Sequence, residues 1–153
     1  MSLAIKGPLL NQSFLCVPLL RLLPDWFGIE AAILNYGREI EHLPTFLAKA
    51  DGGVLGFLSL KQHTPYSVEI LVMAVHPDVQ RGGIGRALVE AAEAYARGLG
   101  IEYMQVKTLG LSNPDPGYAK TRAFYEALGF RPMEEFKQIW DEHNPCLILV
   151  KRL

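Results

Sequence analysis

The sequence predicts an α/β or α+β domain built around one mixed β-sheet, and three observations support this prediction. Segments with the two-residue period of strands alternate along the chain with segments that have the period of helices. The length of 153 residues is that of one domain, so we expect residues 1–153 to form a single domain. Half of the residues are hydrophobic and a fifth are charged, which is typical of a globular chain and argues against disorder.

The periodicity predicts one helix, three strands, a helix, a strand, a helix and two strands, in that order. The expected ranges are 29–40 (helix), 45–50, 54–60 and 67–75 (strands), 83–99 (helix), 101–108 (strand), 118–128 (helix), and 133–140 and 146–152 (strands). Asp51-Gly52, between the first two strands, is a strong hairpin-turn dipeptide. The strand over 67–75 carries apolar residues on both faces, which indicates a central strand. The stretch before residue 29 reads as helical and loop-forming, and no strand is evident in it.

Charge, cysteine count and hydropathy exclude several classes of protein. Sixteen acidic against fifteen basic residues give a net charge of −1, whereas a nucleic-acid or anionic-membrane binder normally carries a basic excess. Cys16 and Cys146 belong to no metal-ligand pair, so we expect two reduced core thiols, no metal and a cytoplasmic location. The apolar stretch 14–23 contains Pro18 and Arg21 and is far shorter than the roughly 20 residues that a membrane helix needs.

The most informative segment joins the strand that ends at Val75 to the helix that follows. It contains the run Gln80-Arg-Gly-Gly-Ile-Gly-Arg86. Glycine has no Cβ, so a ligand can approach its backbone closely. The first N–H groups of a helix have no intrahelical partner and lie at the positive end of the helix dipole. The segment therefore predicts an anion site suited to phosphate, with Arg81 and Arg86 at its rim.

Two common phosphate-binding patterns do not fit this segment. The Walker pattern requires Gly-Lys-Ser/Thr at the end of its loop, whereas Arg86 follows Gly85. A Rossmann loop requires a third glycine at the position where Leu88 stands. Its first glycine also follows the strand closely, whereas Gly82 lies seven residues beyond Val75. A glycine-rich turn that only packs the helix on the sheet remains the alternative to a binding site.

Two motifs in the chain resemble those of the GNAT acyltransferase superfamily. Gln80-Arg-Gly-Gly-Ile-Gly85 is similar to the Q/R-x-x-G-x-G/A signature that opens the main helix of that family, and Met73-Ala-Val-His-Pro77 resembles the preceding strand end. Ala123-Phe-Tyr-Glu-Ala-Leu-Gly-Phe130 resembles the second family signature, and a strand lies between the two, as expected. The resemblance is specific over about residues 67–130 and weak over 1–45. It implies a GNAT-like domain whose central sheet is mixed, mostly antiparallel and flanked by helices.

The resemblance implies that the chain binds acetyl-CoA, or a related acyl-CoA, and transfers the acyl group to an amine. Backbone N–H groups of the glycine segment would hold the pyrophosphate, and the residues implied are Arg81, Gly82, Gly83, Ile84, Gly85 and Arg86. The end of the preceding strand would present backbone groups to the pantetheine arm and the thioester carbonyl, and the residues implied are Met73, Ala74 and Val75. The arm, rich in amides, would pair like an extra strand.

Tyr125 matches the tyrosine that, in the family, protonates the departing CoA thiolate. A tyrosine hydroxyl has a pKa near 10 and stays protonated at neutral pH, so it is a ready donor to a thiolate. We expect Tyr125 at the edge of the core with its hydroxyl free, beside an apolar stripe of Ala123, Phe124, Ala127 and Leu128. A tyrosine that serves only for packing is the alternative.

Glu69 lies at a strand position from which some family members use a glutamate as general base, often through water. A strand-end glutamate in solvent is the alternative. The family often has an asparagine near the start of its second helix that touches the CoA arm, but Ala119-Lys-Thr-Arg122 stands there in this chain. Asn113 lies earlier, so the resemblance fails at this position, and we expect Lys120 or Thr121 to contact a phosphate or the arm instead.

The acceptor side is the least specific part of the resemblance. In the family, the amine pocket comes from the early helices and the loop between the last two strands, here about 24–44 and 140–145. These segments contain aromatic and acidic residues, which suit a cationic amine: Trp26, Phe27, Tyr36, Trp140, Glu30, Glu39, Glu41, Asp141 and Glu142. Core aromatics and surface acids are the alternative. The histidines show no metal-ligand spacing, and we assign no role to them: His42, His63, His76 and His143.

The resemblance therefore implies an acetyl-CoA-dependent N-acetyltransferase in which a primary amine attacks the thioester directly within a ternary complex. The expected partners are acetyl-CoA and an amine acceptor that the sequence does not identify, with no nucleic acid and no membrane, and a homodimer is left open. An acyl-CoA-binding module that lacks catalysis is the second hypothesis. A structural domain without a CoA site is the third.

Overall fold

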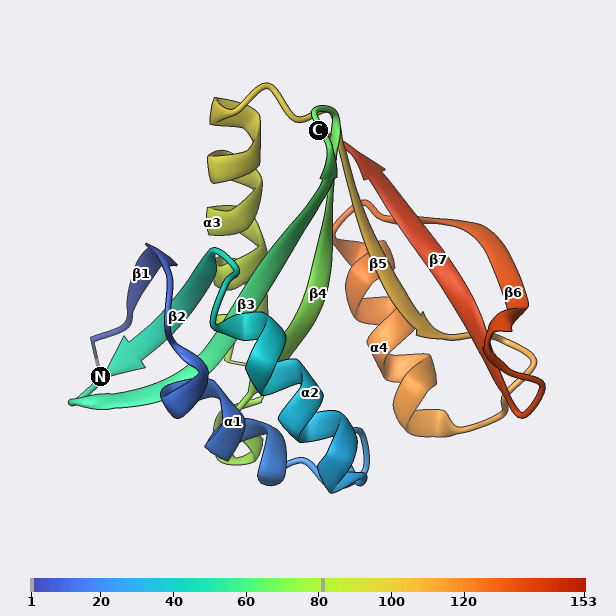
Figure 1. Ribbon diagram of the computed structural model, residues 1–153, viewed down its shortest axis with the longest axis horizontal. Helices are drawn as coiled ribbons and strands as arrows, with labels where there is room; N and C mark the ends of the chain where they lie inside the picture. Colours follow the sequence, from blue (N-terminus) through green and yellow to red (C-terminus); the bar gives the residue numbers. More distant parts are fainter. Residues whose placement is uncertain (1, 81) are drawn as a thin grey trace. The chain divides into compact units, whose positions relative to one another are not determined.

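Strands and helices alternate along the chain in the computed structural model, which describes residues 2–80 and 82–153 (Figure 1). The strands of these residues are β1 (Ala4–Leu9), β2 (Thr45–Ala50), β3 (Gly53–Thr64), β4 (Ser67–Val75), β5 (Tyr103–Leu109), β6 (Arg131–Asp141) and β7 (Asn144–Arg152). The helices are α1 (Ser13–Arg21), α2 (Glu30–Ile40), α3 (Ile84–Gly98) and α4 (Pro116–Ala127), and η1 (Pro77–Val79) is a 3-10 turn. The strands are hydrogen-bonded in the order β1-β2-β3-β4-β5-β7-β6.

The sheet contains both strand orientations, which confirms the predicted fold class. The pairs β1–β2, β2–β3, β5–β7 and β6–β7 are antiparallel, and β4–β5 is parallel. Contacts within the chain divide it into two compact units: unit 1 with residues 1–61 and 71–99, and unit 2 with residues 62–70 and 100–153. The boundaries fall inside β3, after Lys61, inside β4, after Ile70, and after Leu99. The expectation of a single domain over residues 1–153 stays a prediction.

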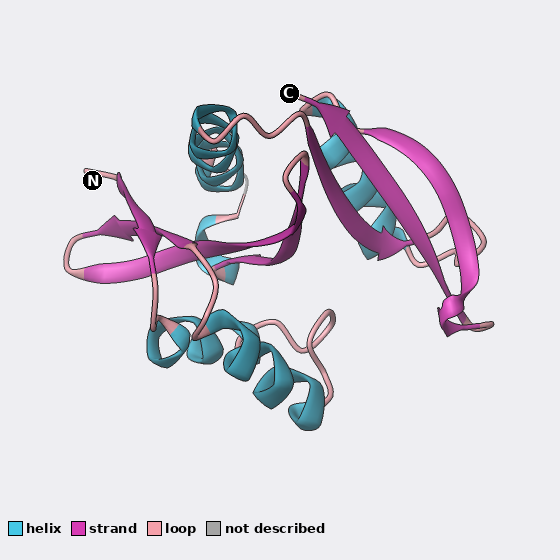
Figure 2. Cartoon of the chain, turned by 45° about the horizontal axis from the view of Figure 1, so that its top comes forward, coloured by secondary structure: helices cyan, strands magenta, loops and turns pink. Residues whose placement is uncertain are grey.

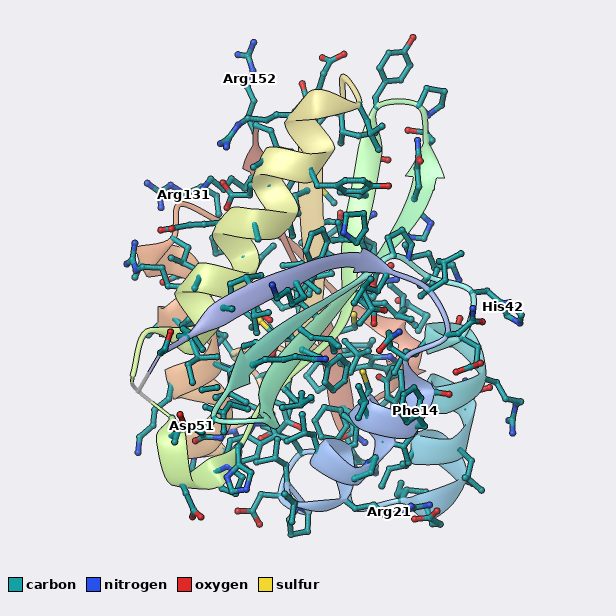
Figure 3. All side chains as sticks on the ribbon, turned by 90° about the vertical axis from the view of Figure 1, so that its left-hand side faces the viewer. Phe14, Arg21, His42, Asp51, Arg131 and Arg152 are labelled. Carbon is teal, nitrogen blue, oxygen red and sulfur yellow. The ribbon has the colours of Figure 1, made fainter. Side chains whose placement is uncertain are left out.

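In unit 1, β2 and β3 form a tight hairpin. Ala50 pairs with Gly53, so the loop consists of Asp51 and Gly52 alone. These two residues have φ angles of +50° and +78°, as a two-residue type I′ turn requires. Asp51 is labelled at this turn in Figure 3. The hairpin predicted from the dipeptide is therefore confirmed.

Helices cover both faces of the β1–β2–β3 layer in unit 1 (Figure 2). On one face, α1 and α2 pack on the strands, and the buried residues of this core include Cys16, Leu19, Leu20, Ile33, Ile40, Leu47 and Phe57. On the opposite face lies α3. Gly56 of β3 lets this helix approach closely, because a Cβ there would stand 3.2 Å from Ile84 Cγ2 and 3.3 Å from Leu88 Cδ1. This contact fixes the first turn of α3 against β3.

In unit 2, helix α4 packs against the β5–β7–β6 layer (Figure 2). The first four residues of β4 pair with β5, from Ser67 with Tyr103 to Ile70 with Val106. Hydrophobic side chains from the strands, from α4 and from the turn after α4 are buried in this unit: Met104, Val106, Tyr125, Leu128, Phe130, Leu147 and Leu149. The predicted thiols are confirmed as free and buried, with Cys16 in unit 1 and Cys146 in unit 2, both 0% exposed.

Strand β1 and the bounds of helix α1 are not predicted by the sequence. Only the first two residues of β1, Ala4 and Ile5, are half-buried, so the strand has no clear apolar alternation. Helix α1 contains Pro18, which lacks the N–H that the helix ladder uses and reads as a helix breaker. Burial of its apolar face stabilises α1 nevertheless. In the part of the chain that the structure describes, no helix is both long and apolar enough to span a membrane.

Candidate functional site

The loop between β4 and α3 is held by its own polar groups. The His76 Nδ1 accepts a hydrogen bond of 3.2 Å from the Asp78 N–H and so caps the turn η1. The Gln80 side-chain amide donates to the Val75 carbonyl over 3.3 Å. These two hydrogen bonds stabilise the loop that leads from the end of β4 to the start of α3. The predicted ligand Arg81 lies outside the described residues.

Gly83 stands directly before α3 in a left-handed conformation. Its φ is +82°, a value that side chains rarely allow, and among described atoms a Cβ there would meet nothing within 4 Å. No side chain caps the helix at this residue. The first N–H groups of α3 therefore keep their hydrogen-bonding capacity. We call this uncapped start of α3 behind Gly83 the glycine cradle, and that it binds an anion stays a prediction.

The other predicted phosphate ligands surround this cradle within unit 1. Gly82 precedes Gly83, and its N–H donates to the Val79 carbonyl over 3.4 Å. Ile84 is buried, 3% exposed, so it anchors the first turn and offers only its backbone. Gly85 follows it in the same turn. Arg86 is exposed, and its guanidinium lies 3.8 Å from the Glu90 carboxylate, a weak pairing that leaves it available at the rim.

The end of β4 carries the residues predicted for the pantetheine arm. Ala74 is buried, and Met73 and Val75 are half-buried. The pairing of β4 with β5 covers Ser67–Ile70, and these three residues lie further along the strand. On the β3 side the next residue is bonded, since the His76 N–H donates to the Leu55 carbonyl over 2.7 Å. The strand end is thus fixed beside β3.

Tyr125 lies on α4 with its ring buried. The side chain is 6% exposed and makes edge-on contacts with the rings of Phe124 and Phe130, with centroids 5.1 Å and 5.5 Å away. Burial raises the pKa of the Tyr125 hydroxyl above its ordinary value of 10.0. Among the described residues this hydroxyl has no hydrogen-bond partner, and it is not sealed from solvent. The phenol is thus a protonated donor, and no described residue accepts its proton.

The face that α4 buries differs from the predicted stripe. Ala123 and Ala127 are exposed, whereas Arg122 and Tyr125 are buried. The reason is electrostatic: the Arg122 guanidinium donates to the Leu109 carbonyl and so turns this face of the helix inwards. Tyr125, three residues on, follows it. The prediction that Tyr125 lies beside a stripe containing the two alanines is wrong.

The two substitutes predicted for the family asparagine lie on the first turns of α4. Lys120 is exposed, and Thr121 is half-buried with its hydroxyl donating to the Gly117 carbonyl over 3.3 Å. Asn113 shapes the loop before the helix, because its side-chain carbonyl accepts from the Asp115 N–H over 2.9 Å. Lys120 is therefore the freer of the two predicted contacts.

Glu69 lies at the centre of a charged cluster in unit 2, which we call the Glu69 cluster: His63, Glu69 and Lys107. The Glu69 side chain is 4% exposed, so the alternative of a glutamate in solvent is wrong. Its Oε1 lies 2.7 Å from His63 Nε2, and Lys107 Nζ donates to Oε1 and Oε2 over 3.3 Å and 3.4 Å. Neither His63 nor Lys107 is among the site residues predicted from the sequence. The buried charge is thus paired on both sides.

The Cys146 thiol is close enough to the Glu69 cluster for its charges to matter. Burial raises the pKa of this thiol, Lys107 lowers it and Glu69 raises it. Cys146 is opposite Leu109 in the β5–β7 pairing, and Lys107 lies two residues before Leu109, on the same face. The Cys146 thiol is fully buried and, with its pKa raised, stays protonated at neutral pH.

Most acids of the predicted acceptor segments are already bound within the protein. Hydrogen bonds from Arg21 lower the pKa of Glu30, and those from Ser13 lower the pKa of Glu41. Glu39 accepts from Lys61 over 3.3 Å. The carboxylate of Asp141 accepts from Asn144, which lowers its pKa. These carboxylates act first as local structural anchors.

The aromatic residues of the same segments divide into two groups. Trp26 and Trp140 are exposed, at 36% and 45%. Phe27 and Tyr36 pack edge-on against each other, with centroids 6.0 Å apart, next to the core of unit 1. A shallow cavity of about 300 Å³ opens between α1 and α2, lined by Ser13, Val17, Leu34, Gly37, Arg38 and Glu41. In the described ranges, 2–80 and 82–153, no three His, Cys, Asp or Glu side chains gather to hold a metal.

The glycine cradle and the mixed sheet define a class of protein, and comparison with known proteins identifies it. A family model described as the acetyltransferase (GNAT) domain matches residues 41–132, more than half of the chain. The chain belongs to this GNAT acetyltransferase family.

Curated relatives and solved structures agree with this assignment. Mycothiol acetyltransferase of Beutenbergia cavernae is 34% identical over 83 residues, which cover 54% of this chain and 26% of that protein. The chain therefore matches only about a quarter of that relative's length.

Solved structures reproduce the fold. A GNAT-family protein from Desulfovibrio desulfuricans is 19% identical with a TM-score of 0.84, and 99% of each chain is covered. A GNAT family acetyltransferase from Elizabethkingia anophelis, solved with acetyl-CoA bound, is also 19% identical, with a TM-score of 0.74 and 99% and 98% of the two chains covered. At this identity the likeness concerns the fold alone.

Proposed function

We propose that the protein is an N-acetyltransferase that transfers the acetyl group of acetyl-CoA to a primary amine by direct attack in a ternary complex. The observation that carries this proposal is the uncapped start of α3 behind Gly83, at the end of β4, in a chain of the GNAT family. An uncapped helix start offers several backbone N–H donors and a positive dipole end to a pyrophosphate.

The cradle holds the phosphates of acetyl-CoA through the backbone of residues 82–86, with the Arg86 guanidinium as a charged group at its rim. The backbone groups of Met73–Val75 lie beyond the stretch of β4 that pairs with β5, and they pair with the amides of the pantetheine arm. Lys120 contributes a further positive charge from α4. The structure with acetyl-CoA bound from Elizabethkingia anophelis supports this choice of donor.

The transfer needs one base and one acid. The acceptor reaches the protein as an ammonium ion and gives one proton to the Glu69 cluster, which leaves a neutral amine. Its nitrogen attacks the thioester carbonyl, a C–N bond forms and the C–S bond breaks. The departing thiolate takes the hydroxyl proton of Tyr125, and the tyrosinate is restored by the second proton of the attacking nitrogen. The products are an acetamide, CoA and one proton on the base.

The chemistry defines the acceptor as a primary amine, and it does not specify the rest of the acceptor molecule. The relatives named mycothiol acetyltransferases are matched over only about a quarter of their length, so their substrate is not carried over. The two free, buried thiols fit the reducing interior of a cell, and we propose a cytoplasmic location.

Calorimetric titration tests the donor side first, with acetyl-CoA, CoA and dephospho-CoA as ligands. Saturable binding of acetyl-CoA and CoA is expected. Release of the CoA thiol is then followed with three probe amines: 1,4-diaminobutane, free lysine and a peptide with an unblocked amino terminus. Binding with turnover of at least one amine supports the proposal, and binding without turnover of any amine favours an acyl-CoA-binding module. Absence of binding in folded protein contradicts both.

A further inference from the structure

We propose that His63 takes the proton from the acceptor amine and that Glu69 acts through it, as a positioning residue. This inference deepens the proposed function and rests on it. It changes the role that the resemblance implies for Glu69. Three observations within unit 2 carry it: the state of the Glu69 carboxylate, the orientation of the His63 ring, and the place of Lys107.

The Glu69 carboxylate is already occupied. Oε1 is shared between His63 Nε2 and Lys107 Nζ, and Oε2 also accepts from Lys107. The side chain is 4% exposed, so an ammonium ion could reach it only by displacing one of these partners. Removing a partner from a buried charge is costly, because the charge then loses its compensation. Glu69 is therefore poorly placed to meet a substrate itself.

The His63 imidazole, unlike the Glu69 carboxylate, is partly exposed and has a free nitrogen. Its side chain is 33% exposed, while its Nε2 is 2.7 Å from Glu69 Oε1. A carboxylate accepts hydrogen bonds, so Nε2 carries a hydrogen and donates it. In the neutral ring, the lone pair then lies on Nδ1. Among the described residues, Nδ1 has no hydrogen-bond partner, so it is a free proton acceptor on a side chain that is a third exposed.

Lys107 completes the arrangement without competing for the proton. An ammonium group has three donors and no acceptor, so it cannot take a proton from the substrate. Its two contacts with Glu69 fix the carboxylate from the β5 side. Among the described residues, His63 is the other side-chain partner of this carboxylate. The carboxylate is thereby held in the position that orients the imidazole. A histidine oriented by a buried carboxylate is an established arrangement for a general base.

The step is balanced. An N–H bond of the substrate ammonium breaks, its proton forms a bond with His63 Nδ1, and the electron pair stays on the amine nitrogen, which becomes the nucleophile. The imidazolium that results is stabilised by the adjacent Glu69 carboxylate. Water removes the proton from Nδ1 after the transfer, because the His63 side chain is a third exposed.

The orientation of the ring is tested without any acceptor, by long-range ¹⁵N–¹H correlation spectra of ¹⁵N-labelled protein at mildly alkaline pH. His63 is assigned by its loss in the His63→Gln spectrum. The spectrum is expected to show a single tautomer with the hydrogen on Nε2. In Glu69→Gln, an amide replaces the carboxylate, and the expected result is a mixture of tautomers. An Nδ1–H tautomer in the wild type, or no change in Glu69→Gln, overturns the positioning role.

Turnover is tested with whichever probe amine the wild type acetylates fastest. His63→Gln is expected to lower kcat/KM by about 100-fold or more, the usual contribution of a general base. Glu69→Gln lowers it as well, and the double variant is expected to be no slower than His63→Gln, because Glu69 acts through His63. The control is Gln62→Ala, an exposed neighbour on the same strand, with an expected change of at most about two- to threefold.

The outcomes separate the two proposals. If the wild type acetylates an amine and His63→Gln stays within about threefold of it, this inference is overturned while the proposed function stands. Fully additive losses in the double variant also overturn it, because they make Glu69 an independent group. If no amine is acetylated by the wild type, the proposed function and the role of His63 fail together, and the tautomer spectra then report only a structural pair.

Discussion

The Arg122 guanidinium donates to the carbonyl oxygen of Leu109 over 2.7 Å and joins helix α4 to the end of strand β5. The same nitrogen is 3.3 Å from the Gly110 carbonyl, and the side chain belongs to a residue that is only 8% exposed. A charged donor to backbone carbonyls is a strong hydrogen bond, since the ionised group shortens and strengthens it. The pair therefore sets the position of α4, and with it the position of Tyr125 one turn further on.

Replacing Arg122 by methionine is expected to lower the free energy of unfolding by about 2 kcal/mol, because the carbonyls of Leu109 and Gly110 lose a charged, buried donor. The measurement is the urea midpoint at constant slope. Arg152→Met is the matched control, since Arg152 is exposed in the same unit and labelled in Figure 3. Equal midpoints in the two variants would contradict the role given to Arg122.

Tyr125→Phe removes the proposed acid and nothing else. Turnover of the best probe amine is expected to fall by about 100-fold or more, whereas CoA affinity and the unfolding midpoint stay unchanged. Stability is kept because the hydroxyl has no hydrogen-bond partner among the described residues. Tyr118→Phe, on the same helix and half-buried, is the control.

The pH dependence of the wild type checks the same assignment. Burial raises the pKa of Tyr125 above 10.0, so the phenol stays protonated throughout the neutral and mildly alkaline range. Ionisation of Tyr125 should therefore cause no loss of turnover at mildly alkaline pH. The pH profiles of the wild type and of Tyr125→Phe should have the same shape in this range. A Tyr125→Phe rate equal to that of Tyr118→Phe would exclude Tyr125 as the acid.

Gly83→Ala is expected to weaken CoA binding by about tenfold or more, because a methyl group in the open space before α3 meets the phosphates. Gly100→Ala is a closely matched control. Gly83 and Gly100 have φ angles of +82° and +79°, and a Cβ at either would meet no described atom within 4 Å. The conformational strain of about 1 to 2 kcal/mol is therefore similar in both variants. Calorimetry that finds the same CoA affinity in both variants would count against the cradle.

The Cys16 thiol makes stability depend on pH in the alkaline range. Burial, followed by the charge of Glu41, raises its pKa from 9.0 to about 12. Above pH 9 the thiol ionises in the unfolded chain and stays protonated in the folded chain, so the folded state binds more protons. The contribution to stability is fully present below pH 9 and is lost as the pH rises toward 12. Its slope reaches about 1.4 kcal/mol per pH unit.

Urea unfolding under reducing conditions at about pH 8 and about pH 10 measures this slope. The free energy of unfolding should fall less in Cys16→Val than in the wild type, because the variant lacks the thiol that titrates. Cys146 and the tyrosines are present in both proteins and cancel in the difference. Identical falls in the two proteins would mean that Cys16 does not carry the effect.

Local signals in the sequence suffice for much of this fold. The central strand Ser67–Val75 is predicted with its observed bounds, because apolar residues on both faces leave it no other place. The hairpin before it follows from Asp51-Gly52, whose positive φ angles few other dipeptides accept. Helix α1 is different: Pro18 argues against it locally, and only the burial of its apolar face against the strands decides in its favour.

The same contrast applies to the candidate site. The cradle is predicted because its glycines lie within four residues, Gly82 to Gly85, and its chemistry belongs to the backbone. The significance of His63 is not predicted, because it depends on a carboxylate six residues away across a turn and on Lys107, 38 residues beyond Glu69 in the chain. A histidine within a few residues of a strand glutamate, across a turn such as Pro65-Tyr66, is the signal that could have indicated this pair.

Cys16 and Cys146 also give the molecule two built-in reporters of local opening. Each of the two units contains one of these thiols, and each thiol is fully buried. A soluble alkylating reagent can therefore modify either one only during a transient opening of the region around it. Mass spectrometry of the two peptides would time these openings separately, in the unaltered chain, and would show which region loosens when acetyl-CoA is added or withdrawn.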